Sequence, residues 1–123
     1  MVKFWLISGA AFALLSVALG AFGAHALKDT LDTYSKDIYQ TAVQYQMFHS
    51  LALLAVGVLQ QIFRQANFDW AGYAFLAGIL LFSGSLYLLA VTGIKGLGAI
   101  TPVGGVAFVA GWIILIIKIA KIL

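Results

Sequence analysis

The sequence contains no cysteine and little charge, with only 9% of its 123 residues charged. Without cysteine, the chain has no disulfide bond, thiolate metal site or cysteine nucleophile. Soluble domains have about 25% charged and about 45–50% apolar residues, whereas 63% of this chain is hydrophobic. The composition therefore excludes an ordinary soluble domain. The seven cationic residues are scattered along the chain, so the net charge of +3 does not predict a nucleic-acid-binding patch.

Charge is absent from four long runs, which cover residues 4–27, 38–63, 70–94 and 96–117. A helix needs roughly 20 apolar residues to cross a bilayer core of about 30 Å. Backbone groups inside lipid must be satisfied within their own segment, which favours a helix for each run. We therefore predict an all-α integral membrane protein with four transmembrane helices in an up-down bundle. The spans are predicted at residues 4–24, 42–63, 70–92 and 102–121 of a single domain, 1–123, with a polar loop at 25–41.

The connections carry helix-boundary signals. In the loop 25–41, charges of alternating sign predict an amphipathic helical turn at the membrane surface. Thr101 followed by Pro102 predicts a helix N-cap and a proline in the first turn. The glycine-rich segment 93–101 is expected to be a connection or a short re-entrant piece.

The charges outside the spans favour cytoplasmic termini. An even number of spans places both ends on one side with Lys3, Arg64, Lys118 and Lys121, against Lys28, Lys36 and Lys95 on the other. The excess of cations on the terminal side indicates the cytoplasm. An alternative is a secretory signal cleaved near residues 24–26, but the first run is longer than the usual signal core of about 7–15 residues.

Small residues recur at four-residue spacing within the runs. In lipid, such faces let helices approach closely, because short-range packing replaces the hydrophobic effect between helices. We expect tight helix packing, within one chain or in an oligomer, at Gly9, Ala13, Ser16, Gly20, Ala24, Gly78 and Gly111.

Polar residues gather in the half of the predicted bundle that lies away from the termini. This candidate cluster comprises His25, Tyr45, Gln46, His49, Ser83, Tyr87 and Thr101. Polar groups in hydrocarbon are costly unless they are paired, so these side chains are expected to face inward. His49 shares a helical face with Ala42, Tyr45, Ala52 and Val56, and we expect it to bond Ser83 or Tyr87.

Three interpretations of this cluster stay open. The first is hydrogen bonding between helices alone, the second is a small cavity for an anionic or carbonyl-bearing ligand, and the third is a proton or metal role for His49. No carboxylate lies inside a predicted span, which argues against proton-coupled antiport and against a catalytic triad. His25 and His49 differ in depth by roughly 10 Å, so we expect no shared haem iron and no other cofactor.

Four strings in the chain resemble a known family. They read GAFGAHAL at residues 20–27, YQTAVQYQMFHSL at 39–51, FSGSLYLLAVTG at 82–93 and LGAITPVGG at 97–105. Together they resemble the domain-of-unknown-function 423 family of small bacterial inner-membrane proteins, to which animal transmembrane protein 256 is similar. The resemblance implies a four-span protein of the bacterial inner (plasma) membrane without an established biochemical activity.

The function expected from the sequence is a structural or accessory one in a membrane complex, without enzymatic activity. The alternative is a small-solute transporter or channel that acts as a homo-oligomer around the polar half-cavity. A membrane enzyme that uses His49 is a third, less favoured class. The expected partners are the lipid bilayer and either further copies of this chain or proteins of a membrane complex, and not nucleic acid.

Overall fold

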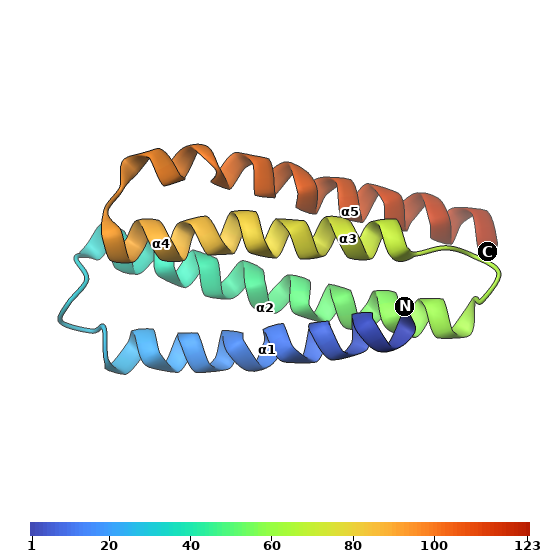
Figure 1. The fold of residues 1–123 in the computed structure, drawn as a ribbon, viewed down its shortest axis with the longest axis horizontal. Helices are drawn as coiled ribbons and strands as arrows, with labels where there is room; N and C mark the ends of the chain where they lie inside the picture. Colours follow the sequence, from blue (N-terminus) through green and yellow to red (C-terminus); the bar gives the residue numbers. More distant parts are fainter.

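The computed structural model describes residues 1–123 as four antiparallel helical rods that lie side by side in a row (Figure 1). The rods are α1 (Val2–His25), α2 (Thr33–Ile62), a third rod made of α3 (Asp69–Gly78), the π-helix η1 (Ile79–Ser83) and α4 (Gly84–Thr92), and α5 (Thr101–Ile122), which follows the short 3-10 helix η2 (Lys95–Ala99). Each rod is long and apolar enough to cross a membrane. The prediction of an all-α protein with four transmembrane helices is therefore confirmed, and both termini lie at the same end of the rods (Figure 1).

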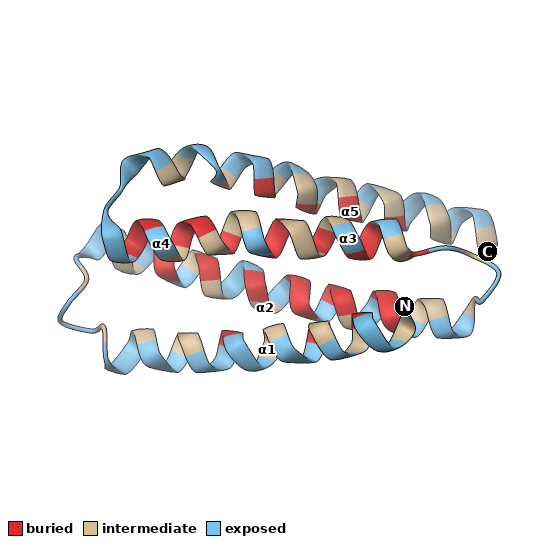
Figure 2. Cartoon of the chain, in the orientation of Figure 1, coloured by how far each residue is buried: buried red, intermediate tan, exposed pale blue.

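α2 and the third rod form the centre of the molecule, and α1 and α5 flank them. α1 packs along α2, α2 packs against the third rod, and α5 packs against α3 and η1. Buried residues therefore concentrate on α2 and the third rod, whereas α1 and α5 are exposed over most of their length (Figure 2). Leu14 on α1 and Val106 on α5 are each 69% exposed. Apolar faces of this kind suit an environment of lipid tails, which are as apolar as leucine.

The larger apolar core lies toward the end that holds the termini. Its members include Trp5 of α1, Val56 of α2, Phe75 of α3 and Leu115 of α5. Trp5 is fully buried, and its indole N–H donates to Asp69 Oδ1 at 2.8 Å. Its ring lies over Gly72, where an added Cβ would come within 2.6 Å of the ring. Trp5 therefore anchors the first helix to the third rod as well as to α2.

Glycines let neighbouring rods interlock. Phe75 of α3 lies against Gly111 of α5, where a Cβ would be 2.7 Å from the ring, and Phe108 of α5 lies against Gly78 in the same way. At Gly9 of α1, a Cβ would be 2.9 Å from backbone atoms of α2. These glycines permit the close approaches that hold helices together in lipid. Of the other small residues considered above, Ser16 is buried, Ala13 and Gly20 are half-buried, and Ala24 is exposed.

α2 begins earlier than the predicted second span. It starts at Thr33 rather than near residue 42, so the segment predicted as a polar loop, 25–41, is helical from Thr33 on. Asp32 caps the helix, because its Oδ1 accepts a hydrogen bond from the Ser35 backbone N–H at 2.7 Å. That bond lowers the pKa of the Asp32 carboxyl below its usual value. The expected helical turn along the membrane surface is instead the first turn of a long helix that enters the bundle directly.

The start of α5 also differs from the prediction. Ile100 occupies the cap position and Thr101 is the first helical residue, with Pro102 in the first turn. The Thr101 hydroxyl bonds Ser85 Oγ of α4 at 2.6 Å, so it serves a contact between rods and not its own helix. Gly93 ends α4 with a φ of 72°, and the glycine-rich connection then forms η2.

Candidate functional site

Gln46 on α2 is the centre of one hydrogen-bonded group. Its side chain is only 3% exposed. Its Nε2 donates to the Phe12 carbonyl of α1 at 2.9 Å, and its Oε1 accepts from the Tyr87 hydroxyl of α4 at 2.6 Å. A single amide therefore holds three rods together at this depth.

His49 lies about one turn further along α2 and is also 3% exposed. Its Nδ1 is 2.8 Å from the Tyr45 carbonyl oxygen, and its Nε2 is 3.0 Å from the indole Nε1 of Trp112 on α5. A carbonyl only accepts and an indole N–H only donates, so Nδ1 carries the proton and Nε2 is the acceptor. The two neighbours thus select one tautomer of the neutral ring. Because both nitrogens are bonded, the ring in this arrangement has no lone pair free for a metal or for proton transfer.

Aromatic rings from α3 and α5 enclose His49. Phe108 stacks on it with ring centroids 3.6 Å apart and an angle of 11° between the planes. Phe75 and Trp112 lie further away, with centroid distances of 5.7 and 5.9 Å. These contacts join α2 to α5, two rods that do not pack along each other.

The remaining buried polar side chains pair locally. Ser83 of η1 is fully buried and donates to the Ala42 carbonyl of α2 at 2.8 Å. Ser85 and Thr101 bond across the gap between α4 and α5. No buried side-chain nitrogen or oxygen lacks a hydrogen-bond partner. The polar half of the bundle is therefore a set of separate, satisfied contacts.

The structure brings together only part of the predicted cluster. His25 is exposed at the end of α1, and Tyr45 is 42% exposed, so neither belongs to the buried group. The expected bond from His49 to Ser83 or Tyr87 is wrong. The Ser83 hydroxyl bonds the Ala42 carbonyl and the Tyr87 hydroxyl bonds the Gln46 amide, and both acceptors precede His49 on α2. His25 and His49 lie on different helices at different depths and do not form a common site.

The sequence interpretation missed the two side chains of α5 that contact His49. Phe108 and Trp112 lie in an apolar run that resembles any membrane-spanning segment. Their four-residue spacing places them on one face of a helix, and a buried tryptophan N–H usually finds a hydrogen-bond acceptor. Those two features together were the available signal.

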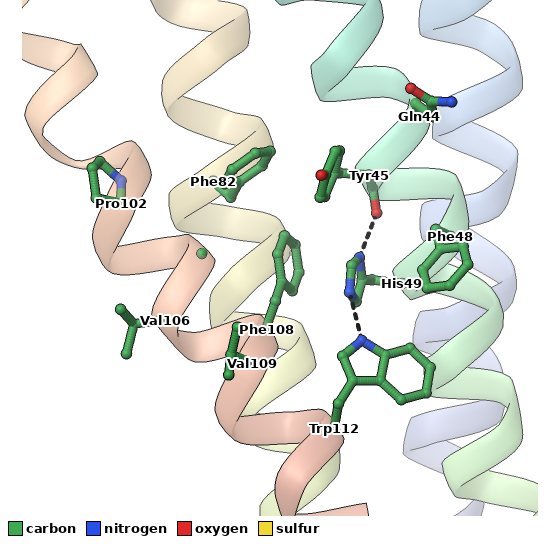
Figure 3. Close-up of a pocket in the computed structure, with 11 residues that line it drawn as sticks. Gln44, Tyr45, Phe48, His49, Phe82, Pro102, Val106, Phe108, Val109 and Trp112 are labelled. Carbon is green, nitrogen blue, oxygen red and sulfur yellow. Dashed lines mark hydrogen bonds between the residues drawn. The ribbon is translucent and has the colours of Figure 1, made fainter.

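A groove of about 830 Å³ opens between α2 and α5 (Figure 3). Tyr45, His49 and Trp112 follow one another along it, and Phe108 faces His49 from α5 (Figure 3). Phe82 brings the π-helix η1 into the lining, and such π-helical turns occur often at functional sites. The groove is mostly apolar, and its volume falls within the range of about 300–1,000 Å³ found for ligand pockets.

Comparison with known proteins finds relatives along the whole chain. A family model described as "Protein of unknown function (DUF423)" matches residues 19–105. The chain is 48% identical to a UPF0382 membrane protein of Staphylococcus aureus, over 98% of both chains. It is 46% identical to the UPF0382 membrane protein YwdK of Bacillus subtilis, over 99% of this chain and 100% of the relative. No solved structure matches. The relatives' names describe membrane proteins and point to no catalytic activity.

Proposed function

We propose a structural or accessory role in a membrane complex for this chain, which belongs to the DUF423 family of proteins of unknown function. Membership confirms the resemblance seen in the sequence strings, and the chain is a polytopic membrane protein like its relatives. The observation that carries the proposal is that every buried polar side chain is already bonded within the protein.

A transport path through one copy would have to pass through these bonds. Gln46 and His49 are both buried, and both polar atoms of each side chain are hydrogen-bonded. Phe75 and Phe108 fill the space between α3 and α5. A polar solute needs groups that exchange their partners as it moves, and breaking paired polar contacts inside hydrocarbon is costly. This packing favours a structural or accessory role over conduction of a solute through a single copy.

The outer helices provide the surfaces that such a role requires. α1 and α5 each have one packed side and a long exposed apolar side (Figure 2). Helices of different chains associate in membranes through faces of this kind, by close packing. We infer that one of these faces contacts a neighbouring membrane protein or a second copy of the chain.

Photo-crosslinking in native membranes tests this proposal. A photoreactive residue is placed at Leu14 of α1, or at Val106 or Ile116 of α5, all of which are exposed. We expect a discrete protein adduct from one helix face, with the other face as its matched control. An adduct at twice the mass of the chain would identify a homo-oligomer. Adducts with lipid alone at all three positions would contradict the proposal.

Reconstitution in vesicles tests the alternative of a transporter or channel formed by several copies. Purified protein is assayed for the flux of small ions and uncharged solutes, beside the variant Gln46→Leu, which loses the bonds to α1 and α4. We expect both proteins to leave the vesicles tight. A flux that the wild type shows and the variant lacks would refute the structural role.

A further inference from the structure

A charged hollow lies beside the apolar groove, and one residue belongs to both. The hollow measures about 660 Å³ and lies where α1 and α2 meet at their loop ends. Gln44, exposed on α2, lines this hollow on one side and the groove between α2 and α5 on the other. The two concave surfaces therefore adjoin across the outer face of α2.

Lys28 and Lys36 are the charged residues that line the hollow. They are eight positions apart in the sequence, and the turn before α2 brings them to the same concave surface. The three nearby aspartates do not line it, and the Asp32 carboxylate bonds the Ser35 backbone instead. The hollow thus brings two lysines together beside the loop ends of α1 and α2, and basic residues near a membrane surface attract anionic lipid.

The polarity of the surface changes in order along α2. Lys36 comes first, followed by the Gln44 amide and the Tyr45 hydroxyl, and then by Phe48 in the groove. At 1.5 Å per residue, Lys36 and Phe48 lie about 18 Å apart along the helix. Half of a bilayer core is about 15 Å thick, so this distance runs from headgroup level into the acyl chains. Across the groove, α5 continues the apolar surface with Val106 and Val109.

We propose that an anionic glycerophospholipid of the bilayer binds along this path. Its phosphate lies between the ammonium groups of Lys28 and Lys36, and an ester carbonyl accepts a hydrogen bond from the Gln44 amide. One acyl chain lies in the groove against Phe48 and Val106. The order of cation, amide and apolar groove matches the order of phosphate, ester and hydrocarbon in such a lipid. The inference does not depend on the structural role proposed above.

Spin-labelled lipids provide the test. The full chain is reconstituted in phosphatidylcholine vesicles with a trace of phosphatidylglycerol or phosphatidylcholine that carries a nitroxide on its acyl chain. The fraction of immobilised label gives the association constant of each lipid relative to the other. We expect phosphatidylglycerol to be favoured by up to about five-fold for each lysine, the effect of one basic residue near an anionic headgroup.

Two pairs of variants separate the headgroup contact from the groove. Lys28→Gln with Lys36→Gln removes the cations of the hollow, and Lys95→Gln, on the same side of the bundle, is its control. Val106→Trp fills the groove from an exposed position, and Val103→Trp, exposed on α5 but outside the groove, is its control. Because these side chains are at the surface, circular dichroism should show unchanged folding.

The outcomes are distinct. The proposal holds if the preference for phosphatidylglycerol disappears in the double lysine variant and in Val106→Trp but persists in both controls. It is overturned if the wild type shows no preference, if Lys95→Gln reduces the preference as much as the double variant, or if Val106→Trp leaves it unchanged. Inorganic phosphate, added at matched ionic strength, should not displace the lipid. Displacement would show that the hollow binds free anions.

Discussion

The bond between Trp112 and His49 can be tested by replacing Trp112 with phenylalanine. The substitution removes one N–H donor and leaves His49 Nε2, in a side chain that is 3% exposed, without its partner. The phenylalanine ring can keep the contact with Phe75, whose centroid is 4.8 Å from that of Trp112. Bonds between transmembrane helices are worth about 0.6–2 kcal/mol, and an unpaired buried acceptor costs about 1–3 kcal/mol. We therefore expect the free energy of unfolding to fall by about 1–2 kcal/mol.

A double-mutant cycle separates the bond from the loss of ring area. His49→Leu, Trp112→Phe and the double variant are unfolded in mixed micelles with increasing dodecyl sulfate, and far-UV circular dichroism follows the loss of helix. If the bond is as described, the two losses overlap, with a coupling free energy of about 1 kcal/mol. His49→Gln should lose less than His49→Leu, because its amide oxygen can accept from the indole N–H.

Trp70→Phe is the matched control, because Trp70 is 65% exposed and its replacement removes no buried contact. This variant should unfold like the wild type. The reasoning fails if Trp112→Phe is as stable as Trp70→Phe, or if the cycle gives a coupling near zero. Either result would mean that the stack on Phe108 and the bond to the Tyr45 carbonyl hold His49 in place without Trp112.

Three further predictions concern packing, pH and topology. Gly111→Ala should lower the free energy of unfolding in detergent by about 1–3 kcal/mol, because the added Cβ would be 2.7 Å from the Phe75 ring. Gly105→Ala, whose Cβ would be 3.8 Å from the nearest ring atom, should leave the stability unchanged. Equal effects of the two substitutions would contradict the interlocking of α3 and α5. Because the pKa of Asp32 is lowered in the folded state, its contribution is present above the unfolded value of 3.8 and lost as the pH falls further. Asp32→Asn should retain the helix cap and abolish the loss of melting temperature that protonation of Asp32 causes at low pH. A variant with the same pH profile as the wild type would contradict this role of Asp32. Reporters fused to the two ends should both indicate the cytoplasm, as we propose for a bacterial inner membrane; opposite locations would contradict the four-span topology.

The four rods could be predicted from the sequence because lipid imposes a simple rule. A charged side chain or an unpaired backbone group costs so much in hydrocarbon that long uncharged runs are almost always helices. The helix ends were less predictable, because they depend on single bonds. From the sequence, Asp32 could cap a helix or belong to a surface turn, and its bond to the Ser35 backbone makes it the cap of α2. Thr101 likewise had a hydroxyl that could cap its own helix or bond another rod.

The site was predictable only in part, for a different physical reason. Of the helical face expected to point inward, Ala42, His49, Ala52 and Val56 are buried, whereas Tyr45 is 42% exposed. Which rod supplies the partner of His49 depends on the order of the rods and on their vertical register. The periodicity of residues within one helix indicates neither the order of the rods nor their vertical register. Trp112 reaches His49 because α5 packs against the third rod in a register that brings the indole to α2, and the spacing of Phe108 and Trp112 indicates their common face but not this register.

The π-helix in the third rod has a consequence for how this chain tolerates insertions and deletions. At η1 the Gly84 N–H bonds the Ile79 carbonyl, five residues back, so the turn holds one residue more than an α-helical turn. Deleting a single residue from Ile79–Ser83 would therefore restore a regular α-helix, and α4 would keep nearly its present orientation relative to α3, because the wide turn only absorbs the extra residue. Phe75 would stay against Gly111, and Leu86 and Tyr87 would still face α2. The third rod can therefore lose one residue at this short segment, whereas a deletion within the regular turns of α3 or α4 would rotate one half of the rod by about 100° relative to the other.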